Sequence, residues 1–269
     1  MLFGGRTDIA QGYAVVTVLD GVKIVAYGSV VDNSTNDPTT IPMKSVAATS
    51  LWVAAAAHAG GEFGSQWRTD LGILNRSGDR VEVEITLVAD AGDTTIDQLL
   101  LADGEQIVLE DVVHRLEVDG SGSLQVTSDR PVLVTSRTYS IGDGGTYGQF
   151  LDGYRTSDAA AHGESRWLAQ LQQNELFRSN IGLLNTGSSE ARVLLSLFDG
   201  DGTELARRRK TIAQGGRLQL QEPFQRIAGR DDVSAGYASV TVERGDGIIA
   251  YGSVIDNATN DPTTVPMQR

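Results

Sequence analysis

The stretch YGSVVDNSTNDPTTIPM, residues 27–43, recurs almost unchanged as YGSVIDNATNDPTTVPM, residues 251–267. Extending the comparison back to Tyr13 and Tyr237 aligns 31 positions without a gap, and 22 of them are identical. The spacing between the two copies is therefore constant over the whole alignment. A repeat at a fixed offset is typical of chains built from an array of similar domains.

A second, weaker repeat lies between these copies. WRTDLGILN at 67–75 matches FRSNIGLLN at 177–185 with an offset of 110, and Trp52 matches Trp167 with an offset of 115. We therefore predict two related modules, one at residues 51–153 and one at residues 166–267. Residues 1–43 correspond to the closing half of a module of the second type, and its opening half is expected from another copy of the chain or from upstream sequence.

The hydrophobic pattern within each module predicts short β-strands. Val81, Val83, Ile85 and Leu87 alternate with Glu82, Glu84, Thr86 and Val88, which is the period-two pattern of a strand with one apolar face. Gly-rich turns follow at short intervals, and we expect hairpins at residues 20–21, 199–202 and 244–247. This spacing predicts an all-β fold of tandem antiparallel β-sandwich modules, immunoglobulin-like in the broad sense, with a β-barrel as the alternative.

Composition excludes several classes of protein. The chain has 269 residues, no cysteine and a formal charge of -13, and it contains no apolar run long enough to span a membrane. Thiol chemistry and disulfides are therefore excluded. A strongly acidic protein repels phosphate backbones, so nucleic acid is not an expected partner, and neither is membrane insertion.

The sequence does not predict an enzyme. His58, His114 and His162 lie in separate segments without the spacing of paired metal ligands, and the module at 166–267 contains no histidine. Neither a nucleophile-elbow motif nor a phosphate-binding glycine loop is present. We therefore expect no catalytic residue and no organic cofactor.

One candidate metal site recurs with the repeat. Asp and Asn oxygens in the loops at 32–37 and 256–261 offer the hard ligands that calcium prefers, and the candidate residues are Asp32, Asn36, Asp37, Asp256, Asn260 and Asp261. The alternative is a pair of Asx-turns, in which the side chains accept hydrogen bonds from the local backbone. The sequence leaves both interpretations open, with the turn favoured.

The three tryptophans are candidates for stacking on sugars. Trp52 and Trp167 occupy equivalent repeat positions, and Trp67 is replaced by Phe177 in the second module. Replacement by another large apolar side chain favours packing in the core over a role in binding.

Several of these segments resemble a known group of repeat modules. AAAAHAGGEFGSQWRTDLGILN (54–75), LFRSNIGLLNTG (176–187) and AYGSVIDNATNDPTTVP (250–266) are similar to modules in secreted proteins of Acidobacteria and related bacteria. The resemblance implies export and a location outside the cell or on its surface. It implies no defined activity.

We therefore expect a non-enzymatic structural protein that builds a surface fibre, filament or stalk through head-to-tail contacts between copies. The alternative is an accessory module that binds carbohydrate or another surface ligand. Residues 1–43 are central to the first hypothesis, because an isolated hairpin is only marginally stable in water. They could also fold back on residues 51–153 of the same chain.

Overall fold

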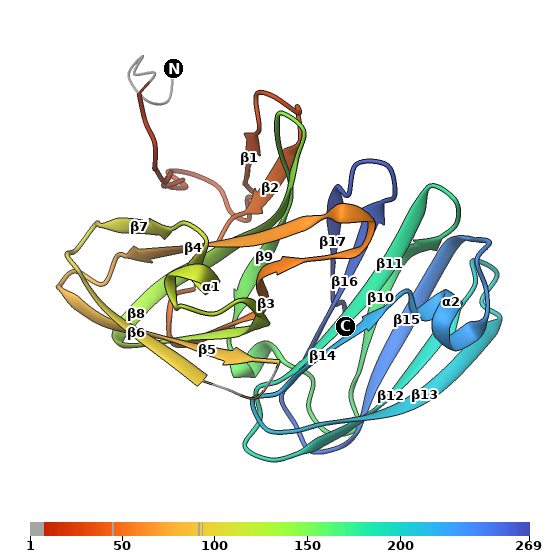
Figure 1. Ribbon diagram of the computed structural model, residues 1–269. Coiled ribbons are helices and arrows are strands. Elements are labelled where there is room, and N and C mark those ends of the chain that lie inside the picture. Colours follow the sequence, from red (N-terminus) through yellow and green to blue (C-terminus); the bar gives the residue numbers. More distant parts are fainter. Residues whose placement is uncertain (1–7, 45, 91, 93) are drawn as a thin grey trace.

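The computed structural model describes residues 8–44, 46–90, 92 and 94–269, so residues 1–7 of the predicted half-module lie outside the described residues. The described chain is all-β with antiparallel strand pairing, as the sequence predicted, and its two α-helices are each a few residues long (Figure 1). No helix among the described residues has the length and hydropathy of a membrane span. We divide the chain into the N-terminal segment (8–44), the first unit (48–154) and the second unit (165–268).

The first unit is one seven-stranded sheet in the order β6-β5-β8-β9-β3-β4-β7. The long strand β8 pairs along its length with β3, β4, β5 and β9. The strands of the first unit therefore form one sheet, whereas the corresponding strands of the second unit form two. The elements are β3 (Ala48–Gly60), the 3-10 turn η1 (Glu62–Gly64), β4 (Gln66–Asn75), β5 (Val81–Ala89), β6 (Thr94–Leu101), β7 (Gln106–Leu109), α1 (Val112–Arg115), β8 (Gly120–Gly142) and β9 (Gly145–Tyr154).

The second unit follows a 3-10 turn, η2 (Thr156–Asp158), and contains two four-stranded sheets. One sheet has the order β10-β15-β12-β13 and the other β14-β11-β16-β17. The elements are β10 (Ser165–Gln173), β11 (Phe177–Asn185), β12 (Ala191–Phe198), β13 (Glu204–Ile212), β14 (Arg217–Gln221), α2 (Pro223–Ala228), β15 (Val233–Arg244), β16 (Ile248–Asp256) and β17 (Pro262–Pro266).

Strand pairings in the two units correspond position by position. Leu71 of β4 pairs with Ser136 of β8, and its repeat equivalent, Ile181 of β11, pairs with Gly252 of β16. β5 pairs with both β6 and β8, as β12 does with β13 and β15. The short helices also correspond, because the residue before each has a left-handed backbone, with φ of 46° in one case and 44° in the other.

The predicted hairpin at residues 244–247 is wrong. β15 and β16, on either side of this turn, lie in different sheets and pair with different strands. The turn therefore carries the chain across the core from one sheet to the other. By contrast, residues 199–202 do join a hairpin, since β12 pairs with β13.

Two hydrophobic clusters fill the structure. β5 shows why the sequence forms such a core, because Val81, Val83, Ile85 and Leu87 are buried while the alternate residues are more exposed. Burial of one such side chain contributes about 1.5–3 kcal/mol. The second cluster lies between the two sheets of the second unit, while the first also includes Leu184, Ile249 and Tyr251 from the second unit. The two units thus share part of one core.

The N-terminal segment has little regular structure. β1 (Tyr27–Val31) pairs only with β2 (Pro38–Pro42), and residues 8–26 form no strand. The predicted hairpin around residues 20–21 is therefore wrong in this structure. A strand needs a neighbour for its backbone hydrogen bonds, and the strands that would lie beside residues 13–31 belong to the opening half of a module. Figure 1 shows β1 and β2 standing beside the tip of the β8–β9 hairpin.

Candidate functional site: an unpartnered half-module and an inter-unit cavity

The N-terminal segment reproduces the local geometry of its repeat. Tyr27 pairs with Pro42 and Val31 with Pro38, and the corresponding pairs in the second copy are Tyr251 with Pro266 and Ile255 with Pro262. The register is therefore the same in both copies. The difference lies on the other edge, where β16 pairs with β11 and β1 has no second neighbour among the described residues.

This difference leaves apolar side chains in solvent. Val25 is 91% exposed and Tyr27 is 75% exposed, whereas their repeat equivalents Ile249 and Tyr251 are 0% and 2% exposed. The same contrast holds along the segment, in which the other exposed residues with buried equivalents are Val16, Val18, Ile24 and Val31. Contiguous exposed apolar surfaces are typical of interaction sites.

Polar contacts nevertheless fix the β1–β2 loop against the first unit. The Asp32 carboxylate accepts hydrogen bonds from both the backbone N–H and the hydroxyl of Thr146 (3.0 and 2.8 Å). The carboxylate of Asp37 is buried, and it accepts from the Gly148 N–H (2.6 Å) and from Arg137 (3.3 Å). The segment thus folds back on its own chain through this loop, and also at residues 11–13, where Gln11 Oε1 accepts from the Val108 N–H (3.1 Å) and the Gly12 carbonyl oxygen accepts from Gln106 (3.3 Å). Val25 and Tyr27 stay exposed in this arrangement.

The predicted calcium ligands of the first loop already have hydrogen-bond partners. Asp32 Oδ1 accepts from the backbone N–H of Ser34 and Thr35, which is the Asx-turn arrangement. The N–H of Ser34 and the contacts with Thr146 lower the pKa of Asp32. Asn36 has a left-handed backbone (φ 60°) and closes the turn through its N–H to the Asp32 carbonyl oxygen.

The second loop repeats the turn but contacts different groups. Asp256 Oδ1 accepts from the N–H of Ala258 and Thr259, and Asn260 Oδ1 accepts from Arg178 (2.8 Å). Burial raises the pKa of Asp261 to about 6, with further contributions from the charges of Asp37 and Asp256. Among the described residues, the acidic side chains of these two loops do not come together as a cluster of three metal ligands. Calcium binding at the six predicted residues stays a prediction.

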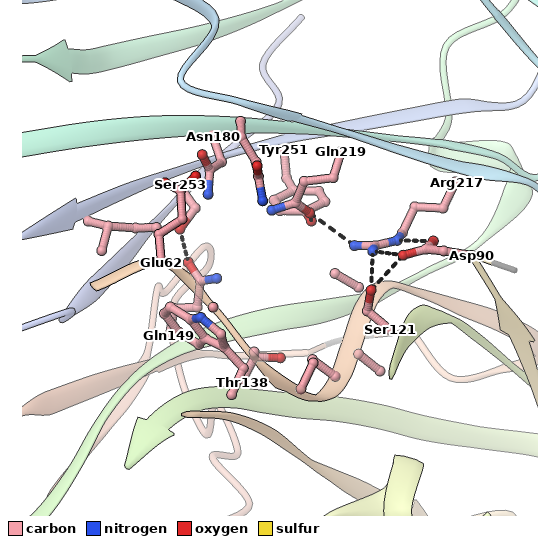
Figure 2. A pocket seen from close by; sticks show the side chains of 18 of the residues that line it. Glu62, Asp90, Ser121, Thr138, Gln149, Asn180, Arg217, Gln219, Tyr251 and Ser253 are labelled. Carbon is pink, nitrogen blue, oxygen red and sulfur yellow. Dashed lines mark hydrogen bonds and ion pairs between the residues drawn. The ribbon is translucent and has the colours of Figure 1, made fainter. Parts of the chain in front are cut away.

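A cavity of about 270 Å³ lies between the two units (Figure 2). Asn180, Gln219 and Tyr251 form one wall on β11, β14 and β16, and Thr138 and Gln149 lie on the opposite wall. The alanine-rich part of β3 completes the lining. The amide and hydroxyl groups in this lining can form hydrogen bonds with water or with a small polar molecule.

Hydrogen bonds and ion pairs close the cavity and connect the units. Arg217 of β14 forms an ion pair with Asp90 and donates to the Ser121 hydroxyl (3.0 Å). Ser253 donates to Gln149 Oε1 (2.9 Å), as Figure 2 shows. At the other end of the cavity, Arg226 forms an ion pair with Glu62 (2.6 Å). These contacts fix the spacing between the units.

The tryptophans differ in environment despite their related positions. Trp52 is 7% exposed and belongs to the first hydrophobic cluster, which agrees with the core interpretation. Trp67 is partly buried and lines the inter-unit cavity. Trp167 is 41% exposed, so its interpretation as a core residue is wrong. It lies beside Phe198 and Tyr237, whose rings stack with centroids 4.7 Å apart.

Comparisons with known proteins do not identify the chain. No protein family matches its sequence, and no curated protein matches it either. Among solved structures, it is similar to Thermotoga maritima 1070 (15% identity, 41% of this chain and 96% of that chain, TM-score 0.35). It is also similar to the PBSX exported protein XepA (7% identity, 90% and 88% of the two chains, TM-score 0.24). TM-scores below 0.5 do not establish a shared fold.

Proposed function

We propose that this chain is a non-enzymatic, extracellular repeat protein that assembles head to tail with other copies of itself. The observation that carries the proposal is the exposure of Val25 and Tyr27, whose repeat equivalents Ile249 and Tyr251 are buried. The resemblance to modules of secreted bacterial proteins supports a surface location. The corresponding strand pairings support a description of residues 51–153 and 166–267 as tandem immunoglobulin-like β-sandwich modules.

The contact between the two units provides a template for the contact between copies. In the first hydrophobic cluster, Ile249 and Tyr251 of the second unit are buried together with Trp52 of the first unit. Trp52 and Trp167 are equivalent, since Trp52 pairs with Tyr154 on β9 and Trp167 pairs with Gln268 after β17. Trp167 is exposed and Trp52 is buried, so the second unit leaves open an aromatic position whose equivalent in the first unit is covered.

We infer that Val25 and Tyr27 of one copy pack against the surface around Trp167 of the next copy. The residues that form this contact differ on the two sides, so it is heterologous and leaves a free surface at each end of the assembly. A heterologous contact that does not close into a ring produces a fibre. This is the geometry expected of a filament or stalk.

Exchange of whole closing halves between copies is a weaker alternative. Residues 8–269 contain one opening half of this type, at residues 165–221, and two closing segments, at residues 13–43 and 237–267. Replacing one closing segment by the other on that half would remove residues 237–267 from the strands with which they pair. The Tyr27–Trp167 contact displaces nothing and buries two surfaces that are otherwise exposed.

Two charge-bearing substitutions test the contact. We expect Tyr27→Glu and Trp167→Glu each to yield monomers, because either change places a charge in an apolar contact. The wild-type chain should form a concentration-dependent series of oligomers, measured by light scattering and viewed by electron microscopy. The control is Leu100→Glu, since Leu100 is also half exposed but lies on β6, outside both surfaces.

Mixing the two monomeric variants gives the sharpest result. The Tyr27→Glu chain keeps its Trp167 surface and the Trp167→Glu chain keeps its Tyr27 surface, so a head-to-tail contact restores one pairing and stops at a dimer. Dimers of Trp167→Glu alone would contradict the proposal, because they would indicate a symmetric contact between N-terminal segments. A wild-type chain that stays monomeric would contradict it as well.

We expect no catalytic activity from this chain. A screen of hydrolase substrates should detect no turnover above buffer. Turnover that disappears when His58, His114 or His162 is replaced would contradict the non-enzymatic proposal.

Carbohydrate binding is the second candidate function, and the surface around Trp167 is the observation that favours it. The exposed Trp167 lies beside the partly buried Phe198 and Tyr237 and forms an aromatic group with them. Aromatic faces of this kind bind the apolar face of sugar rings. A glycan array separates the two functions, because glycan binding by the monomeric Tyr27→Glu variant, lost in Trp167→Glu, would favour the accessory-module alternative.

A further inference from the structure

Two histidines that are far apart in the sequence lie together on the first unit. His58 is on β3 and His114 is on α1, and their rings stack with centroids 4.7 Å apart at an angle of 22°. Asp119, the residue before β8, places a carboxylate oxygen 3.6 Å from His58 Nε2. One ligating atom from each of these three residues lies within 4.8 Å of the others.

A hydrogen bond orients the inner histidine. His58 Nδ1 lies 2.7 Å from Asp111 Oδ2, and Asp111 is also paired with Arg68 at 3.3 Å. The carboxylate can only accept, so in the neutral imidazole Nδ1 carries the proton and Nε2, which lies 3.6 Å from Asp119 Oδ1, keeps a lone pair. A carboxylate behind a ligating histidine is the usual arrangement in metal sites, where it fixes the tautomer and the ring orientation.

The second unit provides an internal comparison for this cluster. Gln173 stands at the repeat position of His58, with the offset of 115 that relates Trp52 to Trp167. Gln173 donates to Glu222 (3.3 Å), the equivalent of Asp111, and Gln225 stands at the position of His114. Glutamine therefore makes the hydrogen bond that this corner of the fold needs. The histidines supply something more, namely two stacked imidazole rings, each with a nitrogen within 4.8 Å of a nitrogen of the other ring.

We propose that His58, His114 and Asp119 form a binding site for a divalent transition metal ion of the zinc type. Two imidazole nitrogens and one carboxylate suit zinc, whereas calcium takes oxygen ligands. His114 and Asp119 are exposed and can close around an ion without disturbing the core. The ion would connect β3, α1 and the start of β8, and it would stabilise the folded chain by binding the native state alone.

Calorimetry with Zn²⁺ alone on the metal-stripped full chain tests the proposal. We expect one ion per chain and a rise in Tm when Zn²⁺ is added. The double variant His58→Gln/His114→Gln, which copies the second unit, should lose both the binding and the Tm rise. His162→Gln is the matched control, because His162 is exposed and lies outside the cluster, and this variant should bind as the wild type does.

A positioning role for Asp111 gives a second readout. Asp111→Asn should weaken Zn²⁺ binding about 10–100-fold without removing a ligand. If the double variant does not fold, as judged by circular dichroism, His114→Gln replaces it, since the side chain of His114 is exposed. Absence of Zn²⁺ binding by the wild type would overturn the proposal, and so would equal binding by the wild type and the histidine variants of the cluster.

Discussion

Tyr27 and Tyr251 occupy equivalent positions in the two copies of the repeat, but their environments are opposite. Alanine substitution at each position therefore measures how much the surrounding residues contribute to the free energy of unfolding. Tyr251 is 2% exposed, its ring lies against Gly182, and its hydroxyl donates to Gln219 Oε1 (2.9 Å). Tyr27 is 75% exposed. We therefore expect Tyr251→Ala to destabilise the chain strongly and Tyr27→Ala to have little effect.

The structure sets the size of both effects. Truncation of a buried aromatic side chain costs about 3–5 kcal/mol of unfolding free energy, from lost burial and from the cavity that remains. Gln219 also accepts a hydrogen bond from Arg217, so loss of the tyrosine hydroxyl leaves its oxygen partly satisfied. A substitution on an exposed surface changes the unfolding free energy by about 0.5 kcal/mol or less.

Urea denaturation, followed by circular dichroism and tryptophan fluorescence, measures both variants. The samples should be dilute, so that the proposed contact through Tyr27 does not add to the apparent stability. If Tyr27→Ala lowered the urea midpoint as much as Tyr251→Ala does, Tyr27 would be buried within its own chain. That result would refute both the exposure argument and the proposal built on it.

A glycine, a buried carboxylate and the two Asx loops give the remaining predictions. Gly252→Ala should cost about 1–3 kcal/mol of unfolding free energy, because the added Cβ would lie 2.9 Å from a Leu171 methyl carbon, while Gly28→Ala, with no atom within 4 Å, should be neutral in the same urea assay. The raised pKa of Asp261, about 6 against an ordinary value of 3.8, means that the folded state holds the proton more tightly. The free energy of unfolding should therefore fall as the pH rises through about 4–6. Asp261→Asn should remove about 1 kcal/mol of this pH dependence, after allowance for solvent screening. An unchanged pH profile in this variant would contradict the assignment of the raised pKa to Asp261. Calcium titration by calorimetry should give no heat, because backbone N–H groups and arginines already occupy oxygens in the loops at 32–37 and 256–261; a calcium response would favour the metal interpretation instead.

Local patterns in the sequence predicted strands better than they predicted connections. The alternation from Val81 to Leu87 identified β5 because a strand with one buried face must repeat every two residues. A Gly-rich turn does not indicate whether the strand that follows it joins the same sheet or the opposite one. The turns at 199–202 and 244–247 look alike, yet the first joins neighbours in one sheet and the second crosses between sheets.

Positions that depend on distant partners were the hardest to predict. His58 and His114 are far apart in the sequence, so a search for metal-ligand spacing within one segment could not pair them. The useful signal was the repeat comparison, in which Gln173 and Gln225 stand at the equivalent positions. The prediction that Trp167 is a core residue was wrong for a related reason. The position of a residue in a strand determines which face of the sheet its side chain occupies, but it does not determine whether another part of the protein covers that face.

The acidic surface limits what kind of contact can join copies of this chain. A formal charge of -13 makes two copies repel each other, so an assembly contact must gain its stability from apolar burial rather than from the net field. Val25, Tyr27 and the aromatic group around Trp167 supply such area, and the equivalent residues Ile249, Tyr251 and Trp52 are buried in one hydrophobic cluster. The repulsion acts against every mode of association, and salt screens it. It therefore selects against contacts without a complementary apolar surface, and the heterologous pairing proposed above has such a surface on both sides.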